Sequence, residues 1–115
     1  MVYISMEKTP LHYASRNGHT DAMQLLIDHR ANVNIRDGPR NTPLHIASYG
    51  DHTEAIRLLI KHGSEIDALN IARHTPLDCA WISRSSNVSV LLMSYGAKCA
   101  RPDIAAKLNA AIIGI

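Results

Sequence analysis

Histidine and cysteine are the side chains of this sequence whose chemistry could bind a metal ion or attack a substrate. The chain has seven histidines and two cysteines. Six of the histidines form pairs 33 residues apart: His12 with His45, His19 with His52, and His29 with His62. The sequence contains no H-E-x-x-H motif, no Cys/His zinc spacing, no Gly-x-Ser-x-Gly and no glycine-rich phosphate loop. We therefore expect no metal, no cofactor, no small-molecule substrate and no enzymatic activity.

The structural roles expected for these residues follow from their positions. His12 and His45 each lie three residues after a threonine, where a ring nitrogen can bond back to a helix cap. Cys79 falls on the apolar side of a predicted helix, so we expect a small core residue there. Two cysteines, Cys79 and Cys99, are too few for a disulfide scaffold, which favours reduced thiols.

The composition is that of one small globular domain. The 115 residues include 12 Lys and Arg against 10 Asp and Glu, so the net charge is 12 − 10 = +2, which gives no argument for nucleic-acid binding. Leu, Ile and Val number 11, 13 and 4, enough to exclude a disordered chain. No apolar run is long enough to span a membrane, and the first residues do not resemble a signal peptide. We expect an intracellular protein, cytoplasmic or nuclear, that does not bind membranes.

A 33-residue repeat organises the chain and explains the histidine pairs. Thr-Pro-Leu occurs at residues 9–11, 42–44 and 75–77. Residues 9–41 and 42–74 share 14 identities, and residues 42–74 and 75–107 share 9. In each unit, Thr is expected to cap a first helix and Pro to occupy its first position. A second capping signal is expected at Thr20, Thr53 and Ser86, ahead of a Leu-Leu stripe that ends at Gly63 and Gly96 but at Arg30 in the first unit.

The repeat motif resembles that of the ankyrin-repeat family. Thr-Pro-Leu-His-x-Ala at 9–14 and 42–47, together with Asn17-Gly18-His19 and the Leu-Leu pairs, carries the resemblance. It implies an all-α solenoid of stacked helix-turn-helix units joined by short β-hairpin or finger loops. No unit can bury its apolar side alone, so stacking supplies the core. We expect Leu58 to be central in that core and its truncation to alanine to cost roughly 2–5 kcal/mol.

The expected domain organisation is a single domain over residues 1–115. It comprises an N-terminal finger (1–8), three repeats (9–41, 42–74 and 75–107) and a C-terminal helix (103–115). That helix is either a cap or the start of a fourth, partial repeat, and both alternatives stay open.

Four departures from the family pattern affect this prediction. In the third unit Asp78 replaces the motif histidine, and residues 81–85 replace the recognisable turn between the two helices. Glu7, Arg40 and Arg73 stand where the family usually has the glycine that closes the finger turn. The second finger carries no turn signal of its own, which leaves its shape open.

The resemblance implies that a partner binds on the concave side formed by the fingers and first helices. Carried over by position, the candidate residues are Tyr3, Lys8, Arg16, Arg36, Arg40, Asn41, Tyr49, Leu69, Ile71, Arg73, His74, Trp81, Ile82 and Arg84. The set is rich in arginine and contains aromatic residues, which binding hot spots favour. The alternatives are a merely solvated face and, for Trp81, a residue that fills a gap. Asn34 is expected to close its finger by hydrogen bonds.

The expected function is therefore a non-catalytic protein–protein interaction module that binds an acidic or mixed partner protein or peptide. The alternative is a targeting or scaffold segment of a larger enzyme or bacterial effector. We expect a monomer and no binding of nucleic acid.

Overall fold

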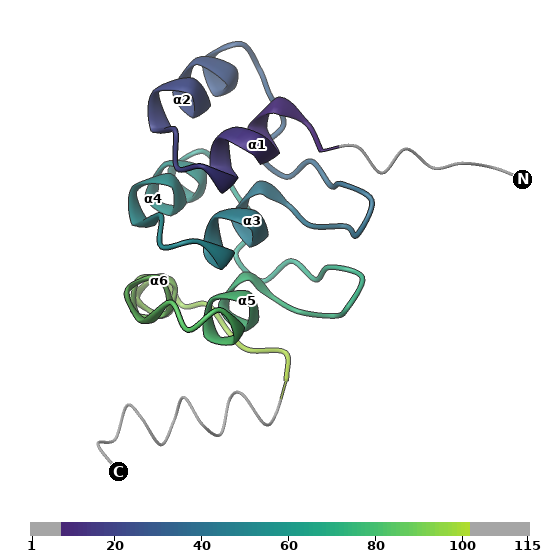
Figure 1. Ribbon diagram of the computed structural model, residues 1–115, viewed down its shortest axis with the longest axis vertical. Helices are drawn as coiled ribbons and strands as arrows, with labels where there is room; N and C mark the ends of the chain where they lie inside the picture. The colour runs from purple at the N-terminus through teal and green to yellow at the C-terminus, as the bar shows by residue number, and fades with distance from the viewer. Residues whose placement is uncertain (1–7, 102–115) are drawn as a thin grey trace, which may run out of the picture.

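The computed structural model describes residues 8–101, which form three helical hairpins stacked in one direction (Figure 1). The inner helices are α1 (Pro10–Arg16), α3 (Pro43–Tyr49) and α5 (Pro76–Ile82), and the outer helices are α2 (Thr20–Asp28), α4 (Thr53–Lys61) and α6 (Ser86–Ser94). Each inner helix packs on the next inner helix, and each outer helix on the next outer helix. This arrangement confirms the all-α solenoid. Tyr3, most of the expected N-terminal finger and the expected helix at 103–115 lie outside the described residues.

Each inner helix begins with a capping box built on its Thr-Pro pair. The hydroxyl of Thr42 accepts a hydrogen bond from the backbone N–H of His45 (3.3 Å), and Nδ1 of His45 accepts one from the backbone N–H of Thr42 (3.1 Å). The same exchange caps α1, and in α5 a carboxylate oxygen of Asp78 replaces the imidazole nitrogen. The predicted bond from the histidine back to its threonine is thus confirmed, and Asp78 keeps the cap intact.

The second ring nitrogen of each capping histidine ties the helix to the end of its finger. Nε2 of His12 donates to the carbonyl of Asn41, and Nε2 of His45 donates to that of His74, both at 2.8 Å. A carboxylate cannot donate, so Asp78 instead accepts the backbone N–H of Ala100 (3.1 Å). The third unit is therefore bonded to the segment after α6 through the Asp78 carboxylate, where the other two units use a histidine ring.

The outer helices begin without a side-chain cap, so the second capping prediction is wrong. Thr20, Thr53 and Ser86 are the first helical residues, and the preceding residues, His19, His52 and Ser85, make no capping bond through their side chains. The outer helices depend on packing against their neighbours for the stability that a cap would otherwise add.

The outer helices end in a left-handed residue, as the glycines predict. Gly63 and Gly96 have φ of 94° and 86°, and Arg30 adopts φ of 68° at the matching position. In all three hairpins the next residue donates back to a carbonyl in the last turn, for example from Ala31 to Leu26 at 3.0 Å. Arg30 thus completes the same helix end that glycine completes elsewhere.

The core is one apolar cluster that runs through all three hairpins. It contains Leu11, Met23, Leu44, Ile56, Leu59, Leu77, Val88 and Leu92, together with smaller side chains. Leu59 is fully buried, whereas Leu58 is only half-buried and lines a surface groove. The expectation that Leu58 is central is therefore wrong by one residue, because the stripe faces inward at the second leucine of the pair.

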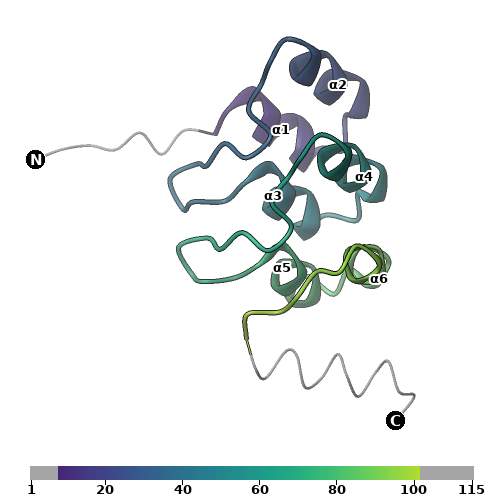
Figure 2. The ribbon, with the colours of Figure 1, turned by 180° about the vertical axis from the view of Figure 1, so that it is seen from behind.

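Finger 1 (residues 32–41) and finger 2 (residues 65–74) project side by side from the inner helices (Figures 1 and 2). In finger 1 the turn closes with a bond from the Arg40 N–H to the Asp37 carbonyl (3.0 Å). In finger 2 the equivalent bond runs from Arg73 to Asn70 (2.9 Å), so the second finger has the same turn despite its sequence. Between residues 8 and 101 neither finger contains a β-strand, so each finger is a loop closed by a turn.

Three of the hydrogen bonds between the two fingers lie at or next to the finger turns. The backbone N–H of Ile71 donates to the carbonyl of Pro39 (2.9 Å), the Asn70 amide donates to Asn41 Oδ1 (2.9 Å), and Nη1 of Arg36 donates to the carbonyl of Leu69 (2.6 Å). These bonds span the boundary between two units, so the fingers form one plate.

Asn34 also joins two units. Its amide donates to the carbonyl of Gly63 (3.1 Å), and its Oδ1 accepts the backbone N–H of Glu65 (2.8 Å). The side chain therefore ties the first unit to the second, a different role from closing its own finger.

Candidate partner-binding face

We define the finger face as the exposed side chains of the two fingers and of the inner helices. Its cations fall into two groups: those without a hydrogen-bond or ion-pair partner among the described residues, and those bonded inside the fold. Arg40 and Arg73 occupy the finger turns and are exposed, as is Arg16 at the end of α1. Among residues 8–101 the guanidinium groups of these three arginines have no hydrogen bond or ion pair, so they are available to carboxylates.

Two other predicted cations are used inside the fold. Lys8 forms an ion pair with Asp37, whose side chain is fully buried and also accepts the backbone N–H of Asn41. Arg36 donates to two finger carbonyls and lies 3.9 Å from a carboxylate oxygen of Glu65. Both residues hold the fingers in place, which leaves them little freedom to bind a partner.

Two further candidates are held by finger hydrogen bonds. Asn41 is buried, and its side-chain oxygen accepts the amide of Asn70. The backbone of His74 bonds to Asn70 and to His45, and its ring lies 3.3 Å from Arg101. Asn41 thus exposes no side chain to a partner, whereas the half-buried ring of His74 remains at the edge of the face.

The last residues of the inner helices form a row in register. Arg16, Tyr49 and Ile82 each end an inner helix, 33 residues apart, and all three are exposed. Burial raises the pKa of Tyr49 well above its usual value, helped by its contact with Cys79. The side chain of Asn70 in finger 2 opposes this rise in the pKa.

Finger 2 adds two exposed apolar side chains to the face. Leu69 is 45% exposed and Ile71 is 68% exposed. The equivalent positions of finger 1 hold Arg36 and Gly38, so the apolar contribution comes from finger 2 alone.

Trp81 and Arg84 lie at the turn between α5 and α6, at the opposite end of α5 from finger 2. With Ser86 and Ser89 they line a recess of about 320 Å³. Trp81 also packs against the core cluster, as its gap-filling role predicts. The structure therefore does not bring these two residues together with the finger tips.

Both cysteines are free thiols, of which Cys79 is buried and Cys99 is half-buried. Burial raises the pKa of the Cys79 thiol to about 11, and burial beside Asp78 raises that of Cys99 to about 12, so both thiols are poor nucleophiles. Within residues 8–101, no three His, Cys, Asp or Glu side chains are grouped as metal ligands would be.

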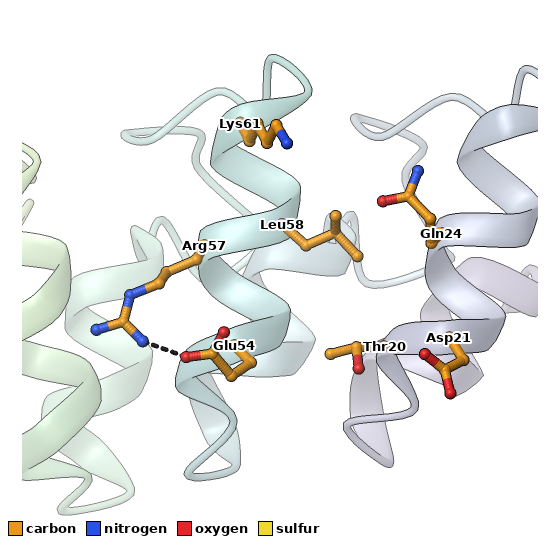
Figure 3. A pocket seen from close by; sticks show the side chains of 7 residues that line it. All are labelled: Thr20, Asp21, Gln24, Glu54, Arg57, Leu58 and Lys61. Atoms are coloured by element: carbon orange, nitrogen blue, oxygen red, sulfur yellow. Dashed lines mark hydrogen bonds and ion pairs between the residues drawn. The ribbon is translucent and has the colours of Figure 1, made fainter.

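A groove that sequence reasoning missed lies on the other side, between α2 and α4 (Figure 3). It has a volume of about 390 Å³ and is lined by Thr20, Asp21, Gln24, Glu54, Arg57, Leu58 and Lys61. Arg57 is ion-paired with Glu54, one turn away. The lining mixes two acids with two cations, which is the composition of an ordinary solvated surface.

Comparison with known proteins agrees with this geometry. Residues 11–60 match the family described as ankyrin repeats (many copies). The structure is similar to that of the ankyrin repeat domain of human ASB11, with 32% sequence identity and a TM-score of 0.75. The match covers 79% of this chain and 41% of that chain. No curated protein matches the sequence.

The capped, stacked hairpins and these matches show that the chain folds as an ankyrin-repeat solenoid, in which residues 11–60 match the ankyrin-repeat family. Ankyrin repeats generally mediate binding between proteins, and they are typically non-catalytic. Among the described residues, no helix has the length and apolar character that crossing a bilayer needs.

Proposed function

We propose that this chain is a non-catalytic module whose finger face binds a partner protein or peptide with an acidic or mixed surface. The observation that carries the proposal is the pair of arginines at the finger tips, Arg40 and Arg73. Both have left-handed backbones, with φ of 64° and 62°, and both guanidinium groups are without a partner among residues 8–101.

Backbone strain supports this choice. A residue other than glycine in the left-handed region costs free energy, and such residues cluster at functional sites. The turn itself needs only the backbone angle, which glycine would supply without strain. We therefore attribute the arginines at both tips to binding through their side chains.

Charge reversal at the tips tests the proposal. Arg40→Glu with Arg73→Glu keeps both residues in the same backbone region and replaces two cations by two acids. Arg57→Glu with Lys61→Glu is the matched control, because it changes the charge by the same amount on outer helix α4. Proteins captured from a nuclease-treated lysate of the source cell by each variant are compared at low and raised salt.

We expect the wild type and the α4 variant to retain the same acidic proteins, and the finger variant to lose them. Retention on the wild type should also fall as salt rises. If the finger variant captures the same proteins as the control, the finger face is not the binding surface.

A further inference from the structure

We infer, on the basis of the proposed function, that the partner segment carries an aliphatic or aromatic side chain between two carboxylates. The carboxylates pair with Arg40 and Arg73, and the apolar side chain contacts Leu69 and Ile71 of finger 2.

The apolar part of this inference rests on the difference between the two fingers. Leu69 and Ile71 are 45% and 68% exposed and stand outside the core cluster, so the fold gains little from their side chains. Finger 1 forms the same turn with Arg36 and Gly38 at these positions. Two branched apolar side chains on one tip and none on the other mark a local apolar contact surface.

The inference that the partner carries carboxylates rests on the positive charge of the two finger tips. The tip cations Arg40 and Arg73 have no counter-ion among residues 8–101. The finger acids have partners of their own: Asp37 pairs with Lys8, Glu65 lies 3.9 Å from Arg36, and Asp67 accepts the backbone N–H of Lys98. A partner that supplies carboxylates meets two cations without opposing acids. A phosphate backbone would satisfy the arginines but would leave the apolar pair without a contact, which favours a protein segment.

The spacing of the acids follows from the stacking of the units. Arg40 and Arg73 hold the same position in successive fingers, so one stacking step separates their backbones. Packed helices are about 8–10 Å apart, and a polyproline II chain rises about 3.1 Å per residue with three residues per turn. The two carboxylates should therefore be about three residues apart in a segment of this conformation, in which residues three apart lie on the same side.

The hydrogen bonds between the two fingers hold the arginines and the apolar pair in place before a partner binds. Three bonds at or next to the turns hold both tips in one register. Ile71 donates to the carbonyl of Pro39, the neighbour of Arg40, and Arg73 follows two residues later, so we expect a segment that crosses the tips to meet arginine, apolar side chain and arginine in that order. Preorganisation of this kind lowers the cost of binding.

A titration followed by nuclear magnetic resonance tests the inference on the full chain. The first probe is a ten-residue peptide containing Glu-Leu-Ser-Glu. The second has Ser in place of Leu, and the third has Gln in place of both Glu. Shifts of backbone amides report both the dissociation constant and the location of binding.

The protein variants are Leu69→Ser with Ile71→Ser, and the control Val90→Ser. Val90 is as exposed as Ile71 (68%) but lies on outer helix α6, so the control replaces one equally exposed apolar side chain away from the fingers. Because all three positions are exposed, the variants should retain the dispersed spectrum of the wild type.

We expect the first probe to bind the wild type at least five times more tightly than the second and third probes, with shifts at both fingers. The finger 2 variant should lose the preference for Leu, and Val90→Ser should keep it. If the first and second probes bind the fingers equally, the apolar anchor is wrong while the acidic function stands. If the first and third probes bind equally, or no probe shifts the finger amides, the inference is overturned together with the acidic preference it rests on.

Discussion

At the scale of single residues, four arginines adopt a backbone conformation that favours glycine. Arg30, Arg40, Arg73 and Arg84 have φ between 61° and 68°. Such a conformation costs a residue with a side chain roughly 1–2 kcal/mol. The glycines at positions 63 and 96, equivalent to 30, show that the helix end requires the angle and not the arginine.

Replacement of Arg73 by glycine should therefore stabilise the protein. Relief of backbone strain exceeds the added freedom of the unfolded chain, so we expect a gain of about 0.5–1 kcal/mol in the free energy of unfolding, measured by urea denaturation. The control Arg57→Gly lies inside α4, where glycine should cost about 1 kcal/mol. A lower midpoint for Arg73→Gly would show that its side chain contributes to the fold.

The buried His45 makes stability depend on pH. Burial lowers its pKa below 6.5, and the hydrogen bond to the carbonyl of His74 opposes this effect only in part. The unfolded chain therefore binds this proton at a higher pH than the folded chain does. The stabilisation of the fold by neutral His45 is complete above pH 6.5 and is lost as the pH falls toward the lowered pKa.

We accordingly expect the free energy of unfolding to fall between pH 7 and pH 5 in the wild type. His45→Gln should be less stable at pH 7 and should show a shallower fall, as measured by urea denaturation at each pH. Equal slopes for the two proteins would mean that other groups cause the dependence.

At the scale of elements, inner and outer helices differ in how they begin. Inner helices carry reciprocal threonine caps, whereas outer helices start without a side-chain cap and depend on their neighbours. A threonine stands at both kinds of start, so the sequence alone makes the two look alike.

A pair of threonine substitutions distinguishes the two kinds of start. Thr42→Ala removes the α3 cap and should cost about 1 kcal/mol in thermal unfolding. Thr53→Ala removes a hydroxyl that caps nothing and should change stability by less than about 0.5 kcal/mol. Equal losses would contradict the assignment of a side-chain cap to α3 and not to α4.

At the scale of the whole molecule, the continuous core makes the three hairpins depend on one another. Met23 of α2, Ile56 and Leu59 of α4, and Leu92 of α6 belong to one cluster. Damage to the central hairpin therefore removes contacts from both neighbours, and unfolding should stay a single transition.

Truncation of the two central leucines measures this dependence. Leu59→Ala should cost roughly 2–5 kcal/mol in urea denaturation because the side chain is fully buried. The half-buried Leu58 is the adjacent control, and its truncation should cost clearly less. A reversed order would place the inward face of α4 one residue earlier.

The sequence by itself determined the 33-residue period, the inner helices, their threonine–histidine caps and the family. These features are local or periodic. A cap joins residues three apart, and because the apolar stripe recurs in every unit, each unit can be expected to pack against the next one. The shape of finger 2 was beyond such reasoning, because Arg73 adopts a glycine-like angle that its residue type does not favour.

Only the tertiary structure decided which cations belong to the fold and which to the surface. Lys8 and Arg36 read as candidate contacts like Arg40 and Arg73, yet the first two meet partners that lie 29 residues away or more. Pairing between distant residues depends on how the fingers stack. The sequence shows that a charged residue is present, but only the folded chain determines which groups lie close enough to pair with it.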